Sequence, residues 1–189
     1  MNTVTGKQTE PLKLIIIGGG YAGLSALITL RKQVPDAEIT LIDPRPDHLI
    51  ITRLHETVHR PLDTIRVSYS LLAKRFDFNH KQQAIQFDED LLRAWDSNKV
   101  IQLVEESLSF DYLLIATGSL PIQSVTQPDV FDLNAISQHG FANVLEHFIA
   151  STDTNNKTIN IVGAGPTGIQ FAFEIAHVLM ACHADYELN

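Results

Sequence analysis

The pattern of apolar and polar positions predicts a strand-helix-strand unit at the start of the chain. Apolar runs with the length of buried strands cover residues 14–17, 38–42 and 111–116. A helical pattern follows the first run over residues 21–33 and stops at the turn Val34-Pro35-Asp36. Residues 14–42 therefore predict a β-α-β unit, whose right-handed crossover makes its two strands parallel.

The rest of the chain predicts shorter elements. Residues 47–63 are polar and rich in His and Arg, which indicates a loop with a short helix. Short alternating runs over residues 76–110 predict hairpin-like antiparallel strands. Residues 130–150 predict a link with one helix, and residues 158–183 predict a strand and a helix, with no second strand before Asn189. This order of elements is typical of an α/β protein.

The first apolar run enters the sequence GGGYAG, which fits G-x-G-x-x-G at Gly18, Gly20 and Gly23. In this pattern the first glycine allows a tight turn, the second lets the backbone approach a pyrophosphate, and the third lets the helix pack close to the strand. The free N–H groups of the helix start favour phosphate. Asp43 ends the next strand, where a carboxylate would accept hydrogen bonds from a ribose. The prediction is a dinucleotide site, and the alternative is a glycine-rich turn beside a surface Asp.

The same pattern returns as GAGPTG at Gly163, Gly165 and Gly168, again between a strand-like run and a helical pattern. No second strand, and no acidic strand end, is expected after it within the sequence. The second pattern therefore predicts the opening part of another dinucleotide-binding unit.

Composition and charge narrow the classes of protein. The chain has 14 Lys and Arg against 22 Asp and Glu, a balance that argues against nucleic acid as a partner. Residues 1–11 do not resemble a signal peptide and no apolar stretch is long enough to span a bilayer, so a cytoplasmic location is expected. The single cysteine, Cys182, excludes a disulfide framework and a C-x-x-C pair within this chain. Its apolar helical surroundings predict a buried, inert thiol.

A further strand in FDYLLIATGSLP ends at Ala116, Thr117 and Gly118. With this strand, the two glycine turns and the acidic strand end, the chain resembles the FAD/NAD(P)-dependent pyridine nucleotide oxidoreductases over residues 12–176. The resemblance implies a Rossmann-like FAD-binding domain, with a parallel sheet, helices and a small antiparallel β-meander, and then the start of a Rossmann-like NAD(P)-binding unit. The implied ranges are 11–150, which lacks the usual C-terminal return of this domain, and 157–189.

The resemblance also implies the cofactors and the residues that bind them, with FAD at the first site and NAD(P)H at the second. The implied FAD contacts are Gly18, Gly20, Tyr21, Ala22, Gly23, Asp43, Pro44, Arg53, Ala116, Thr117 and Gly118. The implied NAD(P)H contacts are Gly163, Gly165, Pro166, Thr167 and Gly168. No residue is assigned to catalysis. Gln170 stands where the family commonly has Glu, and its amide has no proton-transfer ability.

The segment DHLIITRLHETV is similar to type II NADH:quinone oxidoreductases at His48, Leu49, Leu54 and Glu56. Thr52 and His55 depart from that branch. Branches with redox cysteines are disfavoured, because the chain has no cysteine at the required places. The resemblance therefore implies an NADH dehydrogenase-like enzyme that passes a hydride from NAD(P)H to FAD and electrons on to an acceptor such as a quinone. A non-catalytic FAD- or nucleotide-binding fragment is the alternative.

His48, His55 and His59 gather near Arg45 and Arg53, and they are expected to line the flavin loop. Their spacing does not fit a metal site, so no metal is expected. Glu174 is expected on a helix face, and Asp88-Glu89-Asp90 in a solvated turn. The apolar residues of the incomplete second unit are expected to pack against the first domain or a partner, or to stay partly exposed; they are Ile161, Val162, Phe171, Ile175 and Leu179. A complementing chain or a second copy is the partner considered. Full-length relatives are expected at the periphery of the membrane.

Overall fold

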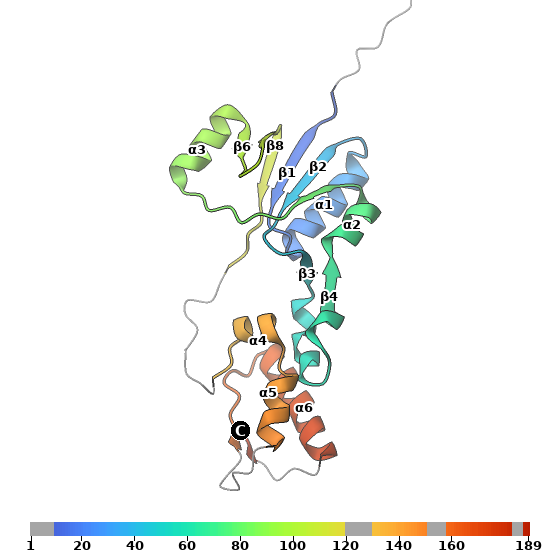
Figure 1. The fold of residues 1–189 in the computed structure, drawn as a ribbon, viewed down its shortest axis with the longest axis vertical. Coiled ribbons are helices and arrows are strands. Elements are labelled where there is room, and N and C mark those ends of the chain that lie inside the picture. Colours follow the sequence, from blue (N-terminus) through green and yellow to red (C-terminus); the bar gives the residue numbers. More distant parts are fainter. Residues whose placement is uncertain (1–9, 120–129, 151–157, 183–186) are drawn as a thin grey trace, which may run out of the picture. The chain divides into compact units, whose positions relative to one another are not determined.

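The computed structural model describes residues 10–119, 130–150, 158–182 and 187–189 (Figure 1). Contacts within the chain divide these residues into two compact units. The first unit comprises residues 10–48 and 67–119, and the second comprises residues 49–66, 130–150, 158–182 and 187–189. The division expected from the sequence places residues 49–66 and 130–150 in the first domain. In the structure these residues pack with the C-terminal helix instead.

The first unit contains a four-stranded parallel sheet with the strand order β5-β2-β1-β8. In chain order these strands are β1 (Lys13–Ile17), β2 (Glu38–Ile42), β5 (Asn79–Lys81) and β8 (Tyr112–Ile115). β1 and β2 are buried over nearly their whole length, as expected for central parallel strands with both faces covered. The helix α1 (Tyr21–Gln33) joins them. The predicted β-α-β unit is confirmed, and its helix has the predicted bounds.

Successive side chains of the two central strands point to opposite faces, and each face has its own cover (Figure 1). One face packs against α1 and α2 (Tyr69–Phe76) through Leu14, Ile16, Ile39 and Leu41. The other face packs through Ile15, Ile17 and Ile42 against α3 (Glu89–Asn98) and the hairpin of β6 (Val100–Gln102) and β7 (Ser107–Ser109). Both faces of the two central strands are therefore covered, which is the layered arrangement of an α/β unit.

The helix α3 corrects the prediction for residues 76–110, where only antiparallel strands were expected. Asp88 caps this helix, because its Oδ1 accepts a hydrogen bond from the backbone N of Leu91 at 2.9 Å. Glu89 and Asp90 occupy the first turn, where negative charge stabilises a helix. The acidic run is thus a helix start and not a solvated turn. Among the described residues of this region, antiparallel pairing is confined to β6 and β7.

The strand β8 corrects the prediction of a fully buried strand at residues 111–116. Tyr112, Leu114 and Ile115 are 66%, 39% and 38% exposed. β8 ends the strand order of the sheet among the described residues, so its apolar side chains have strand neighbours on one side only. Its sequence reads like a central strand, but its position in the described sheet is an edge.

The second unit is built on a parallel pair of strands, β9 (Thr158–Ile159) and β10 (Glu187–Leu188), with α6 (Pro166–Ala181) between them in sequence. The backbone N of Ile161 donates to the carbonyl of Asn189 at 2.8 Å. The expectation of no second strand was therefore wrong. A strand of two residues is too short to produce an apolar pattern that sequence analysis detects.

Four further elements pack with α6 in this unit, namely η1 (Ile51–Val58), η2 (Leu62–Ile65), α4 (Leu133–His139) and α5 (Ala142–Ala150). The core that they share consists of Leu54, Val58, Ile65, Ile136, Leu145, Phe171, Ile175 and Leu179. Residues 130–150 thus contain two helices where one was predicted. Gly140, with a φ of 73°, ends α4 and separates the two. The strands β3 (Asp47–Leu49) and β4 (Arg66–Ser68) pair with each other where the chain leaves the first unit and returns to it.

Cys182 is exposed, so the prediction of a buried thiol was wrong. The buried residues of α6 repeat every four positions, at Phe171, Ile175 and Leu179. Because the helix ends at Ala181, Cys182 lies beyond the last turn and leaves this buried stripe.

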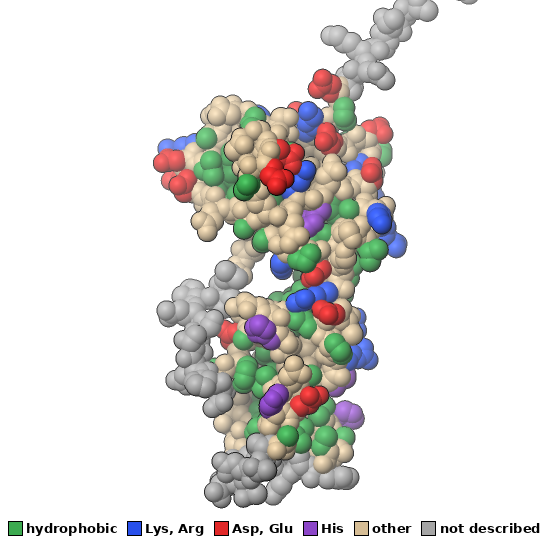
Figure 2. All heavy atoms as spheres, in the orientation of Figure 1, with side chains coloured by type: hydrophobic (Ala, Val, Ile, Leu, Met, Phe, Trp, Pro, Cys, Tyr) green, Lys and Arg blue, Asp and Glu red, His purple; other side chains and the backbone are tan. Residues whose placement is uncertain are grey.

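Within the described residues, no helix is both long enough and apolar enough to cross a membrane. On the face that Figure 2 shows, the described Lys and Arg side chains are scattered among Asp and Glu and form no continuous basic patch. This distribution agrees with the acidic balance of the sequence.

Candidate dinucleotide-binding site

Three glycines shape the turn between β1 and α1. Gly18 has a φ of 103°, and a Cβ there would overlap the carbonyl of Ala116. A Cβ at Gly23 would overlap the carbonyl of Gly18, so glycine is required for the close approach of α1 to the strand. Gly20 differs, because a Cβ there would meet nothing within 4 Å. The turn therefore has open space at its second glycine, the position where this motif lets the backbone approach a pyrophosphate.

The residues predicted to bind the first cofactor, Arg53 excepted, follow the carboxyl ends of three neighbouring strands or begin α1. The backbone N of Gly18 donates to Ile42 at 2.8 Å, and that of Ala116 donates to Ile17 at 2.7 Å. These bonds hold the ends of β1, β2 and β8 together. The residues assembled at this edge are Gly18, Gly20, Tyr21, Ala22, Gly23, Asp43, Pro44, Ala116, Thr117 and Gly118. Ligands of open α/β sheets bind at such an edge.

Asp43 is 2% exposed, and its carboxylate accepts four hydrogen bonds. Oδ2 accepts from the backbone N of Gly19 at 2.7 Å and from Nη2 of Arg45 at 2.9 Å. Oδ1 accepts from the backbone N and from Nε of Arg45, both at 2.9 Å. A carboxylate offers about four acceptor positions. A ribose hydroxyl that donates to Asp43 would therefore share the carboxylate with Arg45, or would replace one of the hydrogen bonds that Arg45 makes to it.

These bonds decide the ionisation of Asp43. Burial raises the pKa of its carboxyl group, but the hydrogen bonds and charge of Arg45, together with the Gly19 bond, outweigh burial and lower the pKa below its usual value of 3.8. The hydrogen bond between the two side chains and the charge of Asp43 in turn raise the pKa of Arg45. Asp43 is therefore ionised at neutral pH. Its neighbour His80 has a pKa that burial lowers, against a smaller opposite effect of Asp43.

Two buried side chains bind the backbone of Gly19. The sequence analysis expected His48 near the flavin, though not as a cofactor contact, and did not identify Tyr69 at all. Oη of Tyr69 donates to the carbonyl of Gly19 at 2.7 Å, and Nδ1 of His48 lies 3.0 Å from the same oxygen. Tyr69 is fully buried and His48 is 7% exposed. The signal in the sequence is the extra glycine. The motif needs glycine at two of the first three positions, and the chain has three in a row.

The turn between β9 and α6 repeats this geometry. Gly163 has a φ of 118°, a Cβ at Gly168 would overlap the carbonyl of Gly163, and a Cβ at Gly165 would meet nothing within 4 Å. Pro166 and Thr167 begin α6, where proline is favoured. Glu187 pairs with Thr158 as Glu38 pairs with Lys13. By this register, the position that corresponds to Asp43 falls beyond Asn189.

The histidines and arginines of residues 45–59 divide between the two units. Arg45 and His48 belong to the first unit, beside the glycine turn. Arg53 belongs to the second, where its Nε pairs with Oε1 of Glu56 at 2.6 Å. In that unit Nδ1 of His59 also lies 3.3 Å from Oε2 of Glu174, a residue expected on a helix face. Over the described ranges, no group of three or more His, Cys, Asp or Glu side chains is placed to hold a metal ion.

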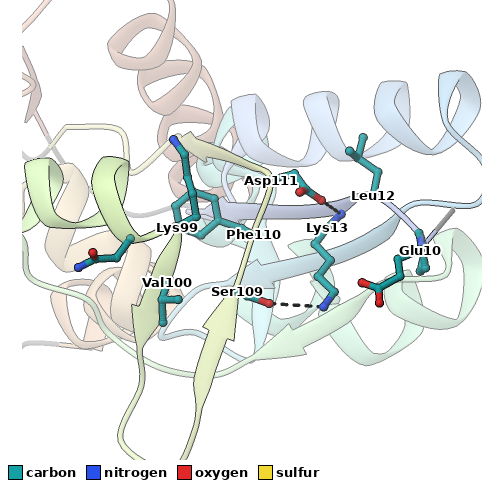
Figure 3. A pocket seen from close by; sticks show the side chains of 10 residues that line it. Glu10, Leu12, Lys13, Lys99, Val100, Ser109, Phe110 and Asp111 are labelled. Atoms are coloured by element: carbon teal, nitrogen blue, oxygen red, sulfur yellow. Dashed lines mark hydrogen bonds between the residues drawn. The ribbon is translucent and has the colours of Figure 1, made fainter.

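A hollow of about 420 Å³ lies at the opposite edge of the first sheet, near the amino ends of β1 and β8 (Figure 3). Three of its charged residues, Lys13, Lys99 and Asp111, already take part in hydrogen bonds. The backbone N of Lys13 donates to Asp111 at 2.7 Å, Nζ of Lys13 to Ser109 at 3.4 Å, and Nζ of Lys99 to Asp96 at 2.8 Å. This hollow contains none of the glycine-turn residues, so the carboxyl edge remains the candidate site.

Two glycine turns of one geometry, each between a parallel strand and a helix, define an α/β protein with two dinucleotide-binding motifs. The profile of the pyridine nucleotide-disulphide oxidoreductase family matches residues 12–184. The chain belongs to this family of enzymes.

A type II NADH:quinone oxidoreductase of Staphylococcus aureus is 28% identical, over 86% of this chain and 42% of that protein. The chain thus spans under half the length of such relatives. Among solved structures, the sulfide:quinone oxidoreductase of Aquifex aeolicus matches with a TM-score of 0.72 and 20% identity, over 94% of this chain and 42% of that one. NDH2 of Plasmodium falciparum, solved in complex with NADH, matches with a TM-score of 0.61 and 22% identity, over 87% and 36%. These structures confirm the Rossmann-like fold.

Proposed function

We propose that the chain is the nucleotide-binding part of an FAD-dependent, NADH dehydrogenase-like oxidoreductase. The first site takes FAD and the second takes NAD(P)H. The observation that carries this proposal is the repeated glycine turn, with open space at Gly20 and again at Gly165. When bound, the flavin accepts a hydride from NAD(P)H and passes electrons to an acceptor such as a quinone.

In this proposal the residues of the chain bind the two cofactors and orient them. The turn at Gly20 and the start of α1 hold the FAD pyrophosphate, with Ala116, Thr117 and Gly118 beside it. The turn at Gly165 holds the pyrophosphate of NAD(P)H. Arg53 remains a proposed contact with FAD. Gln170 is exposed on α6 and has no proton to transfer, so no catalytic residue is proposed.

The partners and the location follow from the same proposal. Apolar side chains are exposed in both units, including Tyr112 at 66%, Phe173 at 73% and Val162 at 99%. These are proposed to be covered by a complementing chain or by a second copy of this one. The proposed location is the cytoplasm, with the complete enzyme at the membrane periphery. Nucleic acid is not a proposed partner.

A non-catalytic FAD- or nucleotide-binding fragment is the second candidate, and Gln170, whose amide has no proton to transfer, favours it. Anaerobic titration of the FAD-loaded full chain with NADH and NADPH separates the two. The oxidoreductase predicts that the flavin absorbance bleaches, and that Gly165→Ala, which fills the open space of the second turn, prevents bleaching but retains FAD. Bound flavin that neither nucleotide bleaches would establish the second candidate.

A further inference from the structure

The peptide groups on both sides of Gly19 are fixed by buried side chains. On one side, the backbone N–H of Gly19 donates to Asp43 at 2.7 Å. On the other, the carbonyl of Gly19 accepts from Tyr69 at 2.7 Å and lies 3.0 Å from Nδ1 of His48. A carbonyl can only accept, so Nδ1 of His48 carries the hydrogen of this bond. Asp43, His48 and Tyr69 come from three different segments and meet at one glycine.

The direction of the next N–H group follows from this arrangement. The peptide bond between Gly19 and Gly20 is trans, so the Gly19 carbonyl and the Gly20 N–H point in opposite directions. The carbonyl points at Tyr69 and His48, which are buried. The N–H of Gly20 therefore points away from them. A Cβ on Gly20 would also meet nothing within 4 Å, so open space adjoins this residue.

We infer that Tyr69 and His48 are positioning residues, which hold the Gly19–Gly20 peptide so that the Gly20 N–H faces the pyrophosphate of the bound dinucleotide. This inference rests on the proposed function of the first site. Neither side chain touches the cofactor in this account. They act through the peptide whose carbonyl they bind, and this gives the turn one fixed orientation before the ligand arrives.

The Tyr69 hydroxyl is suited to this role at neutral pH. Burial, together with the charge of Asp43, raises the pKa of Tyr69, so its hydroxyl keeps the proton that it donates. His48 also packs edge-on against the ring of Tyr21, with 4.9 Å between ring centroids. Tyr21 is the first residue of α1, so His48 contacts the turn and the helix start together.

The test compares Tyr69→Phe with Tyr112→Phe in the full chain. Both changes remove one hydroxyl, but Tyr112 is an exposed residue of β8 outside the glycine turn. The first readout needs no ligand and is the amide spectrum of the protein labelled with ¹⁵N-glycine. The second is the Kd for FAD and for ADP, measured by titration at a temperature where urea unfolding shows each variant to be folded. If Tyr69→Phe does not fold, His48→Leu removes the other donor to the same carbonyl.

The expected result is that Tyr69→Phe shifts the Gly19 and Gly20 resonances and raises both Kd values about fivefold, the usual effect of one hydrogen bond. Tyr112→Phe changes neither. A folded Tyr69→Phe protein with unchanged glycine resonances, or with wild-type affinity for FAD and ADP, would overturn the inference. If the resonances move but the wild type binds neither FAD nor ADP, the proposed function fails, and the role of Tyr69 in binding fails with it.

Discussion

The Tyr69 hydroxyl group both binds Gly19 and occupies the space that a side chain at position 19 would need. Oη of Tyr69 donates to the Gly19 carbonyl at 2.7 Å, and a Cβ on Gly19 would overlap that same Oη. The glycine thus leaves room for the ring, and the ring fixes the glycine. Because Tyr69 is fully buried and packs 4.6 Å from His80, measured between ring centroids, its ring has little freedom to move away.

Gly19→Ala should therefore lower the free energy of unfolding by about 1–3 kcal/mol, the usual cost of overpacking a core. In a double-mutant cycle with Tyr69→Leu, the cost of the alanine should fall, since the atom it meets is gone. Urea unfolding of the four proteins measures both values. An alanine at position 19 with wild-type stability would mean that Tyr69 does not confine this residue.

Gly20→Ala should behave in the opposite way. Its φ of −69° suits alanine and a Cβ has free space, so the free energy of unfolding should change by less than about 1 kcal/mol. The methyl group would occupy the proposed pyrophosphate space, and the Kd for FAD should rise at least about tenfold. Calorimetric titration measures this, with Gly165→Ala as the control that leaves FAD binding unchanged. Equal FAD affinity of wild type and Gly20→Ala would place the cofactor elsewhere.

Asp43 predicts a specific dependence of stability on pH. Its folded pKa lies below the unfolded value of 3.8, so its contribution is complete above that value and is lost as pH falls through the folded pKa. Asp43→Asn should thus be less stable than the wild type at pH 7, and the difference should narrow below about pH 4. Urea unfolding from pH 7 to pH 3 tests this, with the exposed Asp36→Asn as control. A difference that stays constant over this range would contradict the charged pairing with Arg45.

Asp88→Ala should lower the free energy of unfolding by about 1 kcal/mol, since it removes the side-chain cap of α3. Asp90→Ala, in the first turn but without the capping bond, should cost less. Thermal unfolding of both variants compares them. Equal losses would show that charge and not the cap carries the effect.

The sequence predicted the β1-α1-β2 unit well, because its strands are continuous apolar runs and the helix is bounded by glycine and a Pro-Asp turn. Where short-range patterns were ambiguous, prediction failed. The alternating residues 84–90 were interpreted as strand, although Asp88 caps α3. One helix was predicted over residues 130–150, although Gly140 ends α4 before α5 begins. β10 depends on pairing with β9, a tertiary contact that no local pattern encodes.

Prediction of the candidate site from sequence was likewise limited to residues that lie in a local motif. The glycines and Asp43 lie at fixed spacings within one unit, so a motif identifies them. Tyr69 lies fifty residues from Gly19 in sequence, in a segment without a motif, and only the packing of α2 on the sheet brings the two together. Arg45 was named only as a neighbour of the histidines. Its three hydrogen bonds to Asp43, and the fourth from Gly19, depend on the folded turn.

The flavin content of the full chain tests most directly whether the first glycine turn binds FAD. The purified wild type is mixed with excess FAD, desalted, and its absorbance spectrum is recorded, while circular dichroism confirms that it is folded. We expect about one retained FAD per chain, and markedly less in Gly20→Ala. A folded, colourless wild type after desalting would contradict the assignment of the first glycine turn as a flavin-dinucleotide site.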